Sequence, residues 1–175
     1  MALEVYNGTN PTTAEALSGV ADCIDFADKF YGSNLSGSTA EKEATIRRVN
    51  TYMMGLPWAG SLTHGYAQSV PFPRTGLTGV PSGAIPPVVI QAQHMLARAE
   101  HKTIGALSPD ASQGGQVKRE KLDVLEVEYF APASADASRV LVTGALELLA
   151  PYLKAGALDA MGLTDHKPLW GMTAV

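Results

Sequence analysis

The sequence predicts a mainly α-helical fold: a bundle of about four helices with one β-hairpin, a short N-terminal strand and an extended C-terminal arm. Apolar residues recur at helical spacing in four segments, and capping residues or glycines bound these segments. The stretch Gly115–Phe130 instead alternates apolar and charged residues with the period of two typical of a strand. We therefore expect a helical domain at residues 1–156 that contains a β-ribbon at 115–130, and an arm at 157–175 that docks on a partner.

The composition narrows the possible classes of protein. Of the 175 residues, 17% are charged and 46% are hydrophobic, and the net charge is −4. So low a charge density favours a subunit that buries surface in an assembly, and an acidic balance argues against a dedicated nucleic-acid binder. The single cysteine excludes an internal disulfide framework. Because the chain has no apolar run of about 18 residues and no secretory signal, we expect no membrane span and a protein made in a cytoplasm.

Two elements are expected before residue 32. Residues 3–6 alternate in polarity and precede Asn7-Gly8, which predicts a short strand that ends in a turn. Ser18 is the expected N-cap of the first helix, which should end near Tyr31 with Gly32 as the residue after it. The expected inward stripe of this helix comprises Val20, Cys23, Ile24, Ala27 and Phe30.

Capping signals also define the second helix. Ser38 and Glu41 have the spacing of a capping box, and Gly55 follows the expected last residue, Met54. The expected buried face comprises Ile46, Val49 and Met53. Residues 56–83 show no helical period, and a loop of this length is expected to be functional or an interaction surface.

Prolines help to place the third and fourth helices. Ile85-Pro86-Pro87 opens the third helix, because proline is tolerated in a first turn, and this helix should end around Lys102. Its expected stripe comprises Val88, Val89, Ala92, Leu96 and Ala99. We expect Asp136 to cap the fourth helix, Pro151 to weaken its last turn and Gly156 to close it. The inward residues of the fourth helix comprise Val140, Leu141, Leu146, Leu149, Tyr152 and Leu153.

The charge pattern and the strand register both predict a hairpin within the ribbon. With Asp123 and Val124 at its tip, the cross-strand pairs are Leu122 with Leu125, Lys121 with Glu126, Arg119 with Glu128, and Val117 with Phe130. Each of the two opposite-charge pairs contributes roughly 0.2–1 kcal/mol. The turn is the weak part of this prediction, because Asp-Val is not a favoured two-residue turn.

The sequence offers no constellation for enzyme chemistry, and we expect no catalytic residue, metal or cofactor. The four histidines lack the spacing of a zinc site. Cys23 lies on an apolar stripe, which favours a buried and inert thiol. The aspartates of the first helix (Asp22, Asp25 and Asp28) are better explained as a solvated face than as a metal cluster. The run 118–121 is basic enough to contact DNA, but the hairpin register gives two of its three cations glutamate partners.

Several segments resemble one set of small phage proteins, the DnaT-like single-stranded-DNA-binding family. They are Glu41–Ala44 through Arg47-Arg48 and Tyr52, Trp58 with Gly60, Phe72–Gly76, Ile85-Pro86, and Gly115–Lys121 followed by Leu125–Tyr129. The likeness spans Leu3 to about Leu153, and the block Val117–Tyr129 and the Pro-Arg-Thr-Gly loop are its most specific parts. The tail from Ala157 onward is not part of the pattern.

The label of this family implies DNA binding, whereas its gene context and size resemble the head-to-tail adaptor (head-completion or connector) proteins of long-tailed phages. That resemblance implies a ring of about twelve copies that repeats one heterologous interface. The ring would bind the portal protein and a stopper or tail-terminator protein, and genomic DNA would pass through its lumen without sequence-specific binding. It implies a place in the neck of the virion, with assembly in the host cytoplasm.

Contacts between subunits or with neighbouring rings are then expected from the ribbon, the loop 56–83 and the tail. The candidate interface residues are Trp58, Phe72, Arg74, Lys118, Arg119, Lys121, Leu125, Tyr129 and Trp170. For the two tryptophans, a place in the core and a place in an interface are equally compatible with the sequence. Two alternatives stay open. A single-stranded-DNA binder should show exposed aromatics interleaved with lysine and arginine, and a tail-completion or tail-terminator protein should be mostly β.

Overall fold

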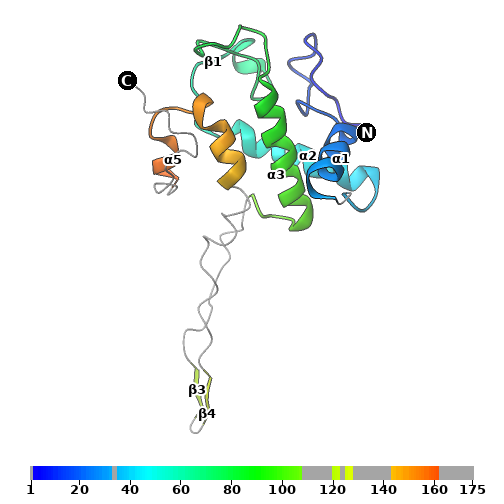
Figure 1. Ribbon diagram of the computed structural model, residues 1–175, viewed down its shortest axis with the longest axis vertical. Coiled ribbons are helices and arrows are strands. Elements are labelled where there is room, and N and C mark those ends of the chain that lie inside the picture. Colours follow the sequence, from blue (N-terminus) through cyan, green and yellow to red (C-terminus); the bar gives the residue numbers. More distant parts are fainter. Residues whose placement is uncertain (1, 33–34, 108–119, 123–124, 128–142, 162–175) are drawn as a thin grey trace.

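The computed structural model describes residues 2–32, 35–107, 120–122, 125–127 and 143–161 (Figure 1). Its helices are α1 (Val20–Tyr31), α2 (Thr39–Met54), α3 (Pro87–Lys102) and the short α5 (Ala157–Ala160). A further helical segment spans residues 143–149 and continues as the 3-10 turn η2 (Ala150–Tyr152). The mainly α character is therefore confirmed. A four-helix bundle is not confirmed, because the expected fourth helix is described only from residue 143.

Local capping signals set the helix ends. The α1 helix begins one residue later than predicted, because Gly19 and not Ser18 is its N-cap. The Ser18 hydroxyl instead donates to the Asp22 carboxylate at 2.9 Å. Gly32 ends α1 in the left-handed region at φ 61°, as predicted. The capping box of α2 is also confirmed, since the Glu41 carboxylate accepts from the Ser38 amide at 2.7 Å and the Glu41 amide donates to Ser38 Oγ at 3.3 Å.

The core forms where α3 packs against α1 and α2. The buried stripes of the three helices comprise Cys23 and Ala27, then Ile46, Val49 and Met53, then Val89, Ala92 and Leu96. Residues 143–149 cover another side of α3, where Gly144 faces Met95 and Leu149 is fully buried. Burial of one large aliphatic side chain stabilises a fold by roughly 1.5–3 kcal/mol. The assignment of Phe30 to the buried stripe is wrong, because its side chain is 64% exposed.

The predicted N-terminal strand is reduced to a single parallel bridge between Val5 and Ala16. The Tyr6 amide donates to the Ala16 carbonyl at 2.8 Å, and the Glu15 amide donates to the Glu4 carbonyl. These bonds hold the first residues of the chain against the segment that leads into α1.

The loop 56–83 contains more regular structure than its sequence indicates. Strands β1 (Ser61–Leu62) and β2 (Arg74–Thr75) pair antiparallel, and the 3-10 turn η1 (Gly65–Ala67) lies between them. The loop is also tied to the chain beyond residue 149. The Ala59 amide donates to the Tyr152 carbonyl at 2.8 Å, and the Lys154 amide donates to the Pro57 carbonyl at 2.9 Å.

The hairpin register is confirmed where the structure describes it. Strands β3 (Glu120–Leu122) and β4 (Leu125–Val127) pair antiparallel, with Lys121 opposite Glu126 and Leu122 opposite Leu125. The expected pairs of Arg119 with Glu128 and of Val117 with Phe130 lie outside the described residues. Figure 1 draws β3 and β4 away from the helices. None of the helices in the described part of the chain is long and apolar enough to cross a membrane.

Candidate functional site

Two aromatic residues expected at an interface lie inside the protein itself. The side chains of Trp58 and Phe72 are 4% and 0% exposed. Their rings pack edge to face, with their centroids 5.1 Å apart. The indole N–H of Trp58 donates to the Met53 carbonyl at 2.6 Å, and Phe72 packs edge to face on Tyr152 at 6.1 Å. Both side chains therefore join the loop 56–83 to α2 and η2, and neither is available to a partner in this structure.

Arg74 is also buried, and it organises the same loop. Its guanidinium donates to three backbone carbonyls: Ala59 at 2.9 Å, Gly60 at 3.1 Å and Pro71 at 3.2 Å. Burial lowers the pKa of Arg74 from its ordinary value. These bonds join the segment at residues 71–74 to the backbone at residues 59–60, next to the β1–β2 pair.

The other candidate residues fall on or beyond the hairpin. Lys121 lies on β3 and Leu125 on β4. The remaining candidates, which lie outside the described residues, are Lys118, Arg119, Tyr129 and Trp170.

The structure reveals an exposed cluster of aromatic side chains at the end of α1. We call Phe26, Phe30 and Tyr31, together with Arg98 of α3, the α1 aromatic patch. The ring centroids of Phe26 and Phe30 are 4.6 Å apart, and Arg98 lies over the Tyr31 ring at 3.8 Å from its centroid. The side chains of Phe30 and Tyr31 are 64% and 40% exposed. An exposed and ordered set of aromatic rings is typical of a binding surface.

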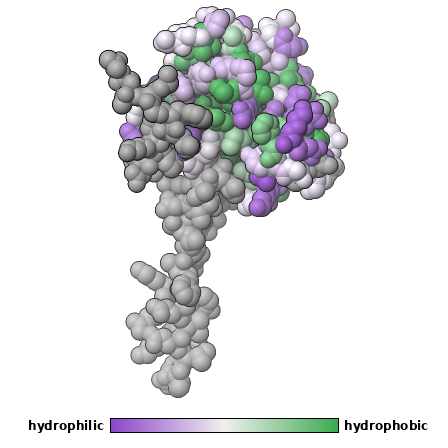
Figure 2. Space-filling view, in the orientation of Figure 1, coloured by the Kyte–Doolittle hydropathy of each residue, from purple (hydrophilic) through white to green (hydrophobic). Residues whose placement is uncertain are grey.

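Acidic side chains share helix α1 with this patch. The exposed residues Asp22, Asp25 and Asp28 lie on α1, where Lys29 is the opposing charge. Figure 2 shows hydrophilic residues gathered over the side of the body where α1 lies, next to a hydrophobic area. Such a surface suits a protein partner better than the phosphate groups of a nucleic acid, because like charges repel.

The described arginines are all engaged within the chain. They are Arg47 with Glu15, Arg48 with Glu100, Arg74 with backbone carbonyls, and Arg98 with Tyr31. The Nε–Oε1 distances of the two ion pairs are 2.9 Å and 2.7 Å. Tight binding of nucleic acid needs cations that can replace the counterions of phosphate groups. Within the described residues, the arginines serve the fold instead.

One group of side chains has the residue types of a serine hydrolase but not its hydrogen bonds. His94 Nε2 lies 3.0 Å from Ser18 Oγ, and the Ser18 hydroxyl donates its proton to Asp22. Because the serine proton is directed to the carboxylate, His94 Nε2 must be the donor to Ser18 Oγ and cannot act as its base. Burial also lowers the pKa of His94 and raises the pKa of the Cys23 thiol to about 12, so neither group is activated.

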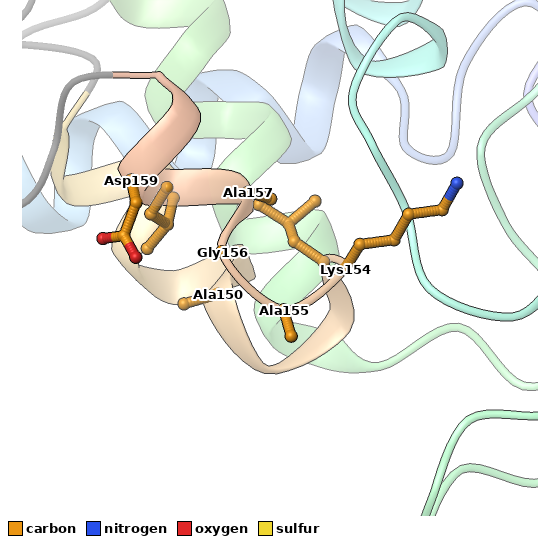
Figure 3. A pocket seen from close by; sticks show the side chains of 8 residues that line it. Ala150, Lys154, Ala155, Gly156, Ala157 and Asp159 are labelled. Carbon is orange, nitrogen blue, oxygen red and sulfur yellow. The ribbon is translucent and has the colours of Figure 1, made fainter.

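Shallow hollows lie on the described surface at two places. One has a volume of about 150 Å³ and lies at the turn between η2 and α5, with Ala150, Gly156 and Ala157 in its lining. In Figure 3 the Lys154 side chain extends away from Asp159, so the two charged groups do not converge on a ligand. The second, of about 290 Å³, lies beside the start of α2 and includes Arg48 and His101. Among the residues that the structure describes, no group of three His, Cys, Asp or Glu side chains could hold a metal ion.

Sequence reasoning missed the α1 aromatic patch, although a signal was present. Phe26 lies outside the predicted inward stripe, and three aromatic residues occur within six positions at the end of the helix. Helical spacing places Phe26 and Phe30 next to each other on the surface, one turn apart. That pair predicts a shared aromatic face, which the assignment of Phe30 to the inward stripe concealed.

The described residues thus define a small, mainly helical protein with a short antiparallel hairpin. The chain belongs to the family described as "Putative DnaT-like ssDNA binding protein", which it matches over residues 1–163. This match covers the helices, the loop 56–83 and the hairpin, and it confirms the family that the sequence motifs indicated. No curated protein and no solved structure matches the chain.

Proposed function

We propose that this protein is a phage virion structural protein, a head-to-tail adaptor that binds the portal and continues the DNA channel toward the tail. The observation that carries the proposal is the engagement of every described arginine within the chain, in a protein of net charge −4. A channel subunit must let DNA slide past, and the contacts of the described arginines within the chain reduce their ability to hold phosphate groups.

The proposed assembly is a ring of about twelve copies that repeats one heterologous interface. The portal would lie on one side of the ring and a stopper or tail-terminator protein on the other. The α1 aromatic patch supports this proposal, because aromatic side chains supply much of the binding free energy at protein interfaces. The ring would be part of the neck of the virion and would assemble in the host cytoplasm.

Mass spectrometry of purified particles tests this proposal directly. The expected result is about a dozen copies per particle, with cross-links to the portal. Phe30→Asp should lower incorporation into particles, because it replaces an exposed aromatic ring of the patch with a carboxylate. Tyr66→Asp is the matched control, since Tyr66 is an exposed aromatic residue on η1, outside the patch. Presence in infected cells combined with absence from particles would contradict the adaptor function.

The description of the family favours a second function, the binding of single-stranded DNA. The α1 aromatic patch also contains the residue types that such binding uses, namely exposed aromatic rings beside the cations Lys29 and Arg98. The aspartates of α1 oppose this function, and we therefore place it second. The tail-terminator alternative has less support, because the described residues are mainly helical.

Fluorescence titration with a labelled oligonucleotide at increasing salt separates the two functions. A single-stranded-DNA binder loses affinity steeply as salt rises, and Phe30→Ala should weaken binding by roughly 1–3 kcal/mol if a base stacks there. Neutral replacements of Lys118, Arg119 and Lys121 should weaken binding further. An adaptor should show no binding at physiological salt, and neither set of substitutions should then matter.

A further inference from the structure

A long part of the chain carries almost no charge. Between Arg48 and Arg98 the sequence contains one charged residue, Arg74, although 17% of the whole chain is charged. Arg74 is 8% exposed, and its guanidinium donates to backbone carbonyls. The structure describes all of residues 49–97, and their surface therefore presents no Asp, Glu or Lys side chain. We call the exposed residues between 60 and 83 the uncharged loop face, and Figure 1 places them at one end of the body, around β1.

This face is held in shape from inside the loop. Gln68 is 2% exposed, and its Nε2 donates to the carbonyls of Val70 at 2.8 Å and Pro73 at 3.1 Å. Its Oε1 accepts from the His64 amide at 3.1 Å. Together with the bonds of Arg74, these contacts give backbone groups of the loop partners within the chain. The face therefore does not depend on another molecule for its shape.

The exposed side chains of this face fit neither an ordinary solvated surface nor the centre of a protein interface. A solvated surface usually carries charges of both signs at roughly 25–35% of its positions, and the centre of an interface is rich in aromatic residues. Within residues 60–83, all of them described, Tyr66 is the only large hydrophobic side chain that is exposed. Its exposed neighbours on the face include Ser61, Thr78 and Ser82. The face is thus polar but uncharged.

An uncharged polar surface suits a polyanion that has to move past it. Cations displace the counterions of phosphate groups and so hold DNA, whereas carboxylates repel it. We propose that the uncharged loop face lines the channel of the adaptor ring, where genomic DNA slides past it. This inference rests on the proposed function and identifies the surface of the protein that faces the DNA. Trp58, Phe72 and Arg74, the residues expected to carry a subunit contact from this loop, are buried within the chain and leave the face free for this role.

Photo-cross-linking in intact particles tests which molecule the face contacts. A phenylalanine analogue that carries a diazirine group replaces Tyr66, whose side chain is fully exposed, so the fold should not change. In particles filled with DNA, light should cross-link this position to DNA. The matched position is Phe30 of the α1 aromatic patch, where the same analogue should cross-link to protein. Cross-links from position 66 to protein alone would overturn the proposal.

Added positive charge gives a second measurement. Tyr66→Lys and Thr78→Lys each place a cation on the face, and the triggered release of DNA from purified particles should become roughly tenfold slower at low salt and recover at high salt. Ala40→Lys is the matched control, because Ala40 is exposed in the first turn of α2, outside the face. Its particles should release DNA at the wild-type rate.

The possible results distinguish this inference from the proposed function. Wild-type release rates in both lysine variants of the face would overturn its place in the channel. Loss of Tyr66→Lys from particles that still incorporate Ala40→Lys would overturn it as well, because the face would then be a contact with protein. Absence of the wild-type protein from particles would instead contradict the adaptor function, and the inference would fail with it.

Discussion

At the scale of single residues, Arg74 is the strongest determinant of the loop 56–83. Its three bonds reach the carbonyls of Ala59, Gly60 and Pro71, and only a planar guanidinium presents donors in that arrangement. Arg74→Lys keeps the positive charge but should leave carbonyl groups without a donor. We expect a loss of about 2 kcal/mol in the free energy of unfolding, measured by urea denaturation.

The control for this prediction is Arg47→Lys. Arg47 forms an ion pair with Glu15 in which both side chains are about one-third exposed, at 31% and 32%. Exposed pairs of this kind contribute less than about 1 kcal/mol. Equal losses in the two variants would mean that the geometry of the Arg74 guanidinium is unimportant.

His94 gives the protein a pH dependence of known sign. Burial lowers the pKa of His94 below its ordinary value, and the charge of Asp22 acts in the opposite direction. The unfolded state therefore takes up this proton at a higher pH than the folded state. The stability contribution of neutral His94 is complete above a pH of about 6.5 and is lost as the pH falls toward the folded-state pKa.

The measurement compares unfolding by urea at pH 7.5 and pH 5.5, about one unit on each side of the ordinary histidine pKa. Wild-type protein should be less stable at the lower pH, and His94→Gln should reduce this difference because glutamine does not titrate. The lowered pKa values of Glu15 and Glu41 have the same sign, but they act only below their ordinary value of 4.5. An unchanged difference in His94→Gln would rule out His94 as its source.

At the scale of elements, the sequence predicts helix ends well, because capping is local. Ser38 with Glu41, and Gly32 after Tyr31, carry their own hydrogen-bond or backbone preference, so neighbouring residues suffice to predict them. The strands β1 and β2 are only two residues long and could not be predicted from alternation. They are held by the buried guanidinium of Arg74, whose partners lie up to 15 residues away in the chain.

The candidate surfaces also divide into features set by neighbouring residues, which could be predicted, and features set by residues far apart in the chain, which could not. The pairing of Lys121 with Glu126 follows from charge and period, which are properties of one short segment. The burial of Glu100 could not be predicted in this way, because its hydrogen-bond partners come from α2 and from the turn that follows α3. Phe30 shows a further limit of sequence-based prediction. A helical period identifies the residues that share one face of a helix, but it does not show whether another element covers the last turn of that face.

The pairing of β1 with β2 depends on a glycine. Gly60 adopts φ 65°, and a Cβ atom there would clash with the Thr75 carbonyl oxygen. Gly60→Ala should therefore reduce the free energy of unfolding by about 2–4 kcal/mol. Gly79 has a similar φ of 74° but open space around it, so Gly79→Ala should cost only the conformational penalty of about 1 kcal/mol. Thermal or urea unfolding of both variants measures the difference, and similar losses would contradict a steric origin.

At the scale of the whole molecule, α5 changes the expected boundary between body and arm. The arm was expected to begin at residue 157, directly after Gly156. In the structure Ala157 is 7% exposed and belongs to the core, and Leu158 and Met161 pack against it. The first residues of the expected arm thus contribute to the helical body, and the docking of the arm on a partner stays a prediction.

Two truncations separate stability from assembly. Removal of residues 162–175 keeps the packed residues of α5, so the unfolding temperature should stay close to that of the full chain. Removal of residues 157–175 also deletes Ala157, Leu158 and Met161. The loss of their buried apolar surface should lower the unfolding temperature by several degrees, about what 1–2 kcal/mol produces in a domain of this size.

If the arm docks on the portal, both truncated proteins should be missing from particles, although the shorter deletion folds normally. Incorporation of the protein that lacks only residues 162–175 would show that assembly depends on the body, with the α1 aromatic patch and the hairpin as the surfaces to test next.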